Sequence, residues 1–320
     1  MKPHLRIGTR GSALALWQAE WVKTRLEELW PGLRVELVPI RTSGDTIQEV
    51  SLATLGGKGL FVKEIEEALL AGTVDLAVHS VKDLPGDFPE GLTLSAVPER
   101  EDARDVLITR NGETLAELPS GTRVGTSSLR RQALLLHLHP GLRIEMLRGN
   151  VDTRLRKQRE GIVDATVLAA AGLKRLGLMP AHSHMLHMLD ERVFLPAIGQ
   201  GALGIETRVN DEAVFSFVTP LNHAASAMAV SVERAFLRCM GGSCRTPLAA
   251  KGTVTDTRVH LTALIASPDG KTLIRGEQEG PHNAVEQIGG SLAERLLAQG
   301  GAEIMEALQR NENLKREETH

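Results

Sequence analysis

Cationic and hydroxyl side chains recur in this chain at the points where short apolar runs end. They lie in the first half of the sequence, and they are Arg10, Ser12, Lys82, Asp83, Thr126, Ser128, Arg130, Arg131, Arg148, Asn150 and Arg154. Guanidinium groups bind carboxylates and phosphates through paired hydrogen bonds, and helix N-termini add backbone N–H donors. A single arginine is more often a solvated surface charge, but several at equivalent positions predict a cleft that holds small anions.

Asp83 and Cys244 are the two residues that could take part in a reaction and not only bind an anion. Asp83, in HSVKDLP, could steady a cationic intermediate or exchange a proton, or it could simply cap a turn. Cys244, in MGGSCRTP, lies in a loop of small residues before Arg245, whose charge would stabilise a thiolate. It is either a nucleophile or covalent anchor, or an inert small residue in a turn. Cys239 lies in an apolar helix and is expected to belong to the core.

The elements that would position these residues alternate as strand, polar turn and helix. The expected elements are 6–10, 12–30 with Ser12 as N-cap, 34–40, 60–71, 74–80, 105–110, 122–128, 129–138, 142–147, 151–161 and 164–177. This order predicts an α/β fold of doubly wound parallel sheets with helices on both faces. Ligands of such sheets bind beyond the carboxyl ends of the strands.

Other segments depart from this alternation. The polar segment 41–58 has no clear period and is expected to be a long loop that serves as a lid. The Gly-rich segment 196–208 is expected to cross back to the first sheet. Strands around 251–266 and 272–279 alternate apolar and polar residues, as in an antiparallel sheet, and one helix over 282–309 is expected to follow.

Composition narrows the class of protein. The net charge is only -3 and there is no Tyr, so neither a basic nucleic-acid binder nor an aromatic stacking platform is expected. The N-terminus has no apolar signal core and no stretch reaches membrane-spanning length, which favours a cytoplasmic protein. The histidines at 182, 184 and 187 have no carboxylate or thiolate pattern beside them, so no metal site is expected.

Seven motifs of this chain resemble, in the same order, those of the porphobilinogen deaminase (hydroxymethylbilane synthase) family. They are RIGTRGSALALWQA, GGKGLFVKEIE, DLAVHSVKDLP, GTSSLRRQA, LRGNVDTRL, PAIGQGALGIE and GGSCRTP. Ser243 stands beside the cysteine where the family usually has glycine. The resemblance implies two domains of the periplasmic-binding-protein type, 1–100 with 200–219 and 101–199, and a small α/β domain with an antiparallel sheet, 220–320.

The resemblance also implies an activity and a cofactor. The family is a transferase that joins four porphobilinogen units, with loss of ammonia, into hydroxymethylbilane for tetrapyrrole (haem or chlorophyll) biosynthesis. Cys244 would anchor a dipyrromethane through a thioether, and Asp83 would be the catalytic carboxylate. The cofactor-binding residues would be Cys244, Ser80, Lys82, Asp83, Thr126, Ser128, Arg130, Arg131 and Arg148. The substrate-binding residues would be Arg10, Ser12, Phe61, Arg148 and Arg154.

Three other classes of protein compete with this interpretation. A small-anion-binding protein without catalysis would explain the arginines but not Asp83 or Cys244. A regulatory effector domain would normally bring a helix-turn-helix, and the sequence shows none at either end. A transferase with a cysteine nucleophile would need no prosthetic group. A monomer without nucleic-acid or membrane partners is expected in the favoured case.

Overall fold

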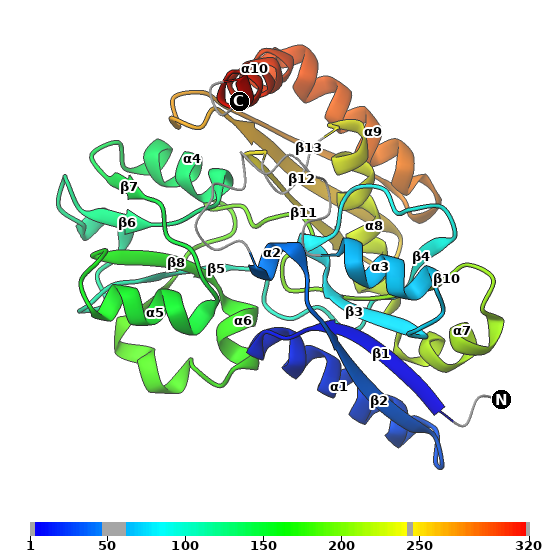
Figure 1. The fold of residues 1–320 in the computed structure, drawn as a ribbon. Coiled ribbons are helices and arrows are strands. Elements are labelled where there is room, and N and C mark those ends of the chain that lie inside the picture. The colour runs from blue at the N-terminus through cyan, green and yellow to red at the C-terminus, as the bar shows by residue number, and fades with distance from the viewer. Residues whose placement is uncertain (1–3, 47–61, 242–245, 318–320) are drawn as a thin grey trace.

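The computed structural model describes residues 4–46, 62–241 and 246–317, which form three β-sheets with helices between and around them (Figure 1). Phe61 and Cys244 lie outside these ranges, as does most of the expected loop at 41–58. Residues Ser43–Thr46 of that segment form a short helix, α2, where no helix was expected.

The first sheet has five strands in the order β2-β1-β3-β10-β4. Their bounds are β1 His4–Arg10, β2 Arg34–Ile40, β3 Leu76–Ser80, β4 Leu92–Ala96 and β10 Leu203–Arg208. Helices α1 (Ala13–Leu29) and α7 (Glu212–Val218) pack on one face through an apolar cluster, and α3 (Lys63–Leu70) covers the other. The Gly-rich segment does cross back, because β10 pairs with both β3 and β4.

The second sheet repeats this architecture in the order β7-β6-β8-β5-β9. Its strands are β5 Asp105–Ile108, β6 Arg123–Gly125, β7 Arg143–Glu145, β8 Ala165–Ala169 and β9 Leu186–Met188. Helix α4 (Leu129–Leu138) contributes to the core on one face, while α5 (Val151–Arg159) and α6 (Ala170–Arg175) contribute to that on the other.

The α/β class and the helices on both faces were predicted correctly, but each of the two sheets mixes parallel pairs with antiparallel ones that were not expected. β10 runs antiparallel to β3 and β4, and β5 runs antiparallel to β8 and β9. The reason is the path of the chain, since β5 and β10 enter their sheets at the two places where the chain passes from one sheet to the other.

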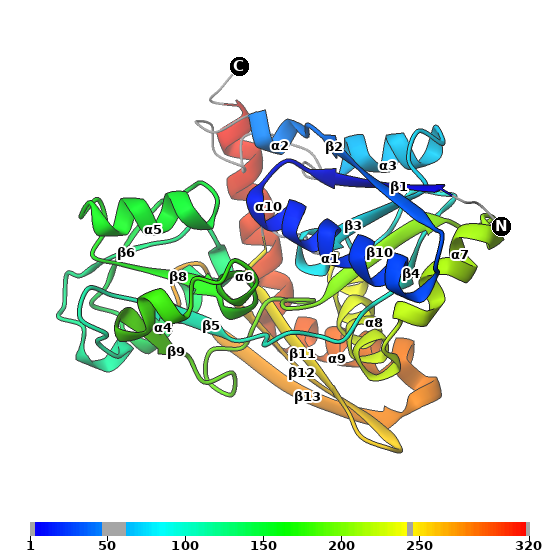
Figure 2. The ribbon, with the colours of Figure 1, turned by 90° about the horizontal axis from the view of Figure 1, so that it is seen from below.

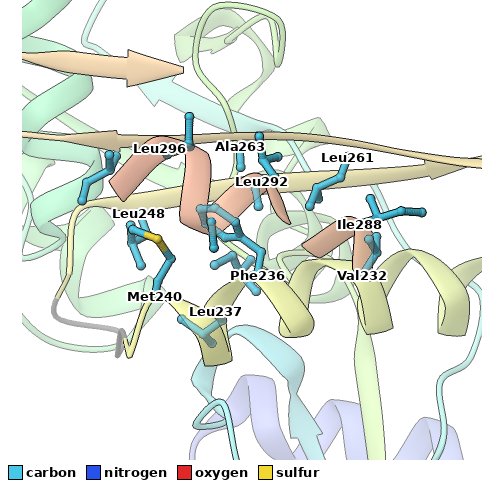
Figure 3. Packing of buried hydrophobic residues seen from close by; sticks show 14 of the residues in the cluster. Val232, Phe236, Leu237, Met240, Leu248, Leu261, Ala263, Ile288, Leu292 and Leu296 are labelled. Carbon is cyan, nitrogen blue, oxygen red and sulfur yellow. The ribbon is translucent and has the colours of Figure 1, made fainter. Parts of the chain in front are cut away.

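The third sheet is antiparallel, as expected, in the order β11-β12-β13. Its strands are β11 Leu248–Val254, β12 Arg258–Ala266 and β13 Leu273–Pro281, so the expected strand region 251–266 is two strands joined by a turn. Helices α8 (Ala224–Cys239) and α9 (Val285–Leu296) pack on it through Val232, Phe236, Ile288 and Leu292 (Figure 3).

The prediction of a single helix over 282–309 is also wrong. A kink separates α9 from α10 (Ala302–Glu317), because Gly300 has a φ of 110° that a continuous helix cannot accommodate. Figures 1 and 2 show the first and second sheets side by side, with the third sheet against the second lobe and α8 between the third sheet and the first lobe.

Among the described residues, no single helix is long and apolar enough to cross a bilayer. The helical segments Glu212–Leu221 and Ala224–Cys239 have the length and composition of a membrane span only when they are taken together, and the chain bends by 108° between them.

Candidate active site

The Lys82–Asp83 turn begins where β3 ends in the middle of the first sheet. A short 3-10 helix covers Val81–Asp83, and the N–H of Val81 donates to the carbonyl of Ala202, 3.0 Å away, just before β10. Gly199 has a φ of 70°, and a Cβ there would lie 2.9 Å from the Cβ of Val81 and 3.1 Å from the Lys82 nitrogen. The Gly-rich crossing therefore packs directly against the turn, and its close approach requires glycine.

Ser80 is held by a residue that the sequence analysis missed. The Gln18 amide of α1 lies within hydrogen-bond distance of the Ser80 hydroxyl, with its Nε2 donating over 3.0 Å. Gln18 is buried on the same side of α1 as Val22 and Leu26. Gln18, Val22 and Leu26 follow one another at intervals of four residues, so Gln18 lies on the apolar face of α1. This spacing could have identified it from the sequence.

Positive charge gathers around Asp83. Burial lowers the pKa of Lys82 to about 8; Asp83 opposes this shift, and Arg131 and Arg154 add to it. Burial, followed by repulsion from Arg131 and Arg148, likewise lowers the pKa of Arg154 to about 10, and Asp83 again opposes the shift. These shifts indicate that cations from both sheets lie within electrostatic range of one carboxylate.

Arg130 and Arg131 are oriented by Asp105, which opens β5 and was not predicted as part of the site. The Arg131 guanidinium donates to Asp105 Oδ1 over 3.0 and 2.7 Å, and Arg130 Nη1 lies 2.8 Å from Oδ2. Burial alone would raise the pKa of Asp105, but the two arginine charges and their hydrogen bonds prevail and lower it to about 2. Both arginines are buried.

Hydroxyl and amide side chains cap the helices that follow the strands. Ser12 accepts from the Ala15 N–H over 3.3 Å, Ser128 from that of Arg131 over 3.4 Å, and Asn150 from that of Thr153 over 2.9 Å. Thr126 is buried, and its hydroxyl accepts from the Ser128 N–H over 3.2 Å. Ser12 was predicted as an N-cap, and this is confirmed.

Of the remaining predicted residues, Arg154 donates from Nε to the Gly149 carbonyl over 2.8 Å. The Arg148 carbonyl accepts from Lys157 over 3.2 Å, which fixes the start of α5. Arg10 is half-buried at the end of β1. The positions of Phe61 and Cys244 lie outside the described residues.

The prediction that Cys239 belongs to the core was wrong. It is the last residue of α8 and is exposed. Its neighbour on α9 is Gly290, where an added Cβ would lie 3.5 Å from the sulfur. Among the described residues, no group of three or more His, Cys, Asp or Glu side chains could hold a metal ion.

Fold and site together define an α/β protein with two lobes, the first of which is completed by β10 after the second, and a small third unit, with a cationic cluster around one carboxylate. Among solved structures, the Escherichia coli periplasmic aliphatic sulphonate-binding protein matches at 19% identity and a TM-score of 0.41 over 74% of this chain and 70% of that one. An ancestral cationic amino acid solute-binding protein matches at 16% identity and a TM-score of 0.42 over 68% and 88%.

The family is identified by sequence. Residues 5–216 match the model of the porphobilinogen deaminase dipyromethane cofactor binding domain, and 227–298 match that of the C-terminal domain. The porphobilinogen deaminase of Syntrophotalea carbinolica is 55% identical over 95% of this chain and 96% of its own. That of Geobacter sulfurreducens is 53% identical over 98% of each. The chain belongs to the porphobilinogen deaminase family.

Proposed function

We propose that this chain is a hydroxymethylbilane synthase that joins porphobilinogen units head to tail with release of ammonia. The observation that supports it best is the set of cations from both sheets around Asp83, described above. Each porphobilinogen carries two carboxylates, so a growing chain accumulates negative charge that such a cluster can bind. Family membership does not favour the alternative of an anion-binding protein without catalysis.

Asp83 is the proposed catalytic residue. Loss of ammonia from an aminomethylpyrrole leaves a cation delocalised onto the pyrrole nitrogen. A fixed carboxylate near that nitrogen stabilises the charge as it develops. Lys82 and Arg154, whose charges act on Asp83, are proposed to hold substrate carboxylates and so keep the ring over it.

The residues present fit a dipyrromethane, because its acetate and propionate groups need several cations and hydrogen-bond donors in one place. Arg130 and Arg131 are fixed by Asp105, while Ser128 and Thr126 place hydroxyls at the start of α4. We assign these residues, with Ser80, Lys82, Asp83 and Arg148, to the cofactor, and Cys244 as its thioether anchor. Lys82 and Arg148 are proposed to bind carboxylates of both the cofactor and the incoming substrate. The bound dipyrromethane supplies the pyrrole carbon to which the first unit is joined.

Arg10, Ser12, Phe61, Arg148 and Arg154 are assigned to the incoming substrate. We further propose that the three sheets mark three domains, 1–100 with 200–219, 101–199 and 220–320, which accord with the crossings at β5 and β10. The enzyme is proposed to act in the cytoplasm as a monomer, without nucleic-acid or membrane partners.

Intact-protein mass spectrometry tests the anchor. The purified chain is expected to exceed its sequence mass by two pyrrole units, and Cys244→Ser is expected to have the unmodified mass and no turnover. Cys239→Ser is the matched control, because this second thiol is exposed and outside the proposed site. An unmodified mass in active wild-type protein would overturn the proposal.

A further inference from the structure

Three ionisable side chains are buried together in the first sheet, away from the cationic cluster. They are Glu66 on α3, His79 on β3 and Glu206 on β10, with exposed fractions of 7%, 5% and 0%. Glu206 lies opposite Ala77 in the β3–β10 ladder, and Ala77 packs with α3. His79 is two residues further along β3 and therefore faces the same way.

The hydrogen bonds of this group are incomplete. His79 Nε2 lies 2.9 Å from Glu206 Oε2. The other Glu206 oxygen, Oε1, and Oε1 of Glu66 are buried without a hydrogen-bond partner among the described residues. A buried carboxylate oxygen without a donor is costly, and the cost falls when one of two neighbouring carboxyl groups keeps its proton.

The charges around Glu66 and Glu206 also favour a proton on one of these two carboxyl groups. Burial lowers the pKa of Arg234, on α8, to about 10 and Glu206 opposes this shift, so the guanidinium lies within electrostatic range of that carboxylate. Glu66 faces Glu206 and His79, and Glu67 adjoins it on α3. Burial, then repulsion from Glu206, raises the pKa of Glu66 from 4.5 to about 7, although His79 opposes the shift.

We propose that Glu66 keeps its proton while Glu206 beside it is ionised, and that this proton is needed to hold the Lys82–Asp83 turn in place. The link to the turn is short. Ser80 pairs with Leu203 in the β3–β10 ladder, and the Val81 N–H donates to Ala202, 3.0 Å away. Loss of the proton places two negative charges between α3 and the strand pair that ends at the turn.

Glu66 is thus a positioning residue, and its role in turnover rests on the function proposed above. Its ionisation is expected to lower kcat as the pH rises through about 7, with little change in KM. Glu66→Gln, which resembles the protonated side chain in shape, is expected to remove this step from the kcat profile. Glu67→Gln is the matched control, since Glu67 is the next residue on the same helix and is exposed.

The proton itself is tested without reference to activity. Infrared difference spectra of the cofactor-loaded protein at pH 6 and pH 8.5 are expected to show a buried carboxylic-acid carbonyl band that is lost on raising the pH. The band is expected in wild type and Glu67→Gln and absent from Glu66→Gln. In Glu206→Gln its loss is expected at lower pH, because the repelling charge is gone. No band in wild type, or a band that persists in Glu66→Gln, would overturn the proposal.

Thermal unfolding provides a second measurement. An acid with a raised folded-state pKa costs stability progressively as the pH rises from 4.5 to about 7, and the full cost remains above that range. Glu66→Gln escapes this cost, so its Tm relative to wild type is expected to rise between pH 5 and pH 8. A Tm difference that is constant with pH would contradict a proton on Glu66, and would leave the assignments of Asp83 and Cys244 untouched.

Discussion

Asp105 shows how one buried residue can organise an anion site. It binds Arg130 and Arg131 from opposite oxygens, so two guanidinium groups on consecutive residues are held at fixed orientations inside the second sheet. A buried ion pair adds little net stability, and its more general use is to fix geometry. We infer that Asp105 pre-orients the arginines, which reduces the ordering that a bound polycarboxylate must otherwise cause.

The charge on Lys82 is expected to govern substrate affinity at alkaline pH. Its folded-state pKa is about 8, so the ammonium is present below that pH and is lost above it. A charge-assisted hydrogen bond contributes about 1.5–3 kcal/mol, so KM for porphobilinogen is expected to rise about tenfold or more above pH 8. Lys82→Arg should move that rise to higher pH.

Steady-state kinetics at a series of pH values checks this prediction. Lys63→Arg is the control, because Lys63 is exposed on α3 and 69% of its side chain is accessible. An unchanged inflection of KM in Lys82→Arg would show that another group titrates.

Among the elements, the crossing segment before β10 packs against the Lys82–Asp83 turn and is expected to fix its position. Gly199→Ala places a methyl group against Val81 and a residue at a φ of 70°, and both effects act on the turn. We expect the free energy of unfolding to fall by about 1–3 kcal/mol. We also expect kcat to fall to a small fraction of its wild-type value, because the turn is displaced.

Gly177→Ala separates the two effects. Gly177 has a φ of 67°, but nothing lies within 4 Å of an added Cβ. The Gly177→Ala variant is expected to have a lower Tm, because of backbone strain, and an unchanged kcat. Equal losses of turnover in the two variants would show that the close approach of Gly199 to the turn has no catalytic consequence.

The positions of the helices and strands along the chain could be predicted from the sequence more accurately than the way in which the strands pair. Apolar periodicity indicated β1, α1, β2 and β3 near their observed bounds, since local patterns determine them. The directions of β5 and β10 could not be predicted, because they depend on where the chain crosses between sheets. Asp105, Gln18 and Glu66 were missed for a related reason: a polar residue becomes part of a buried network only through partners distant in sequence.

The whole molecule has a net charge of only -3, so attraction of the anionic substrate must be local. The Debye length is about 10 Å at 0.1 M salt, which weakens attraction at long range. KM is therefore expected to rise several-fold between about 0.05 and 0.5 M salt while kcat changes little. Arg154→Gln should show a shallower dependence than wild type.

Arg159→Gln is the matched control for the salt series, because Arg159 lies at the exposed end of the same helix, α5. A similar reduction of the salt dependence in both variants would mean that general surface charge, and not the cluster around Asp83, attracts the substrate.

The most direct test of the account is Asp83→Asn measured against Asp87→Asn, an exposed carboxylate four residues later. Intact mass should show the dipyrromethane on both variants. Asp83→Asn is expected to form hydroxymethylbilane at least about 100-fold more slowly than wild type, the scale of losing one electrostatic stabiliser, and Asp87→Asn is expected to retain its rate. A cofactor-loaded Asp83→Asn enzyme with full turnover would contradict the central claim.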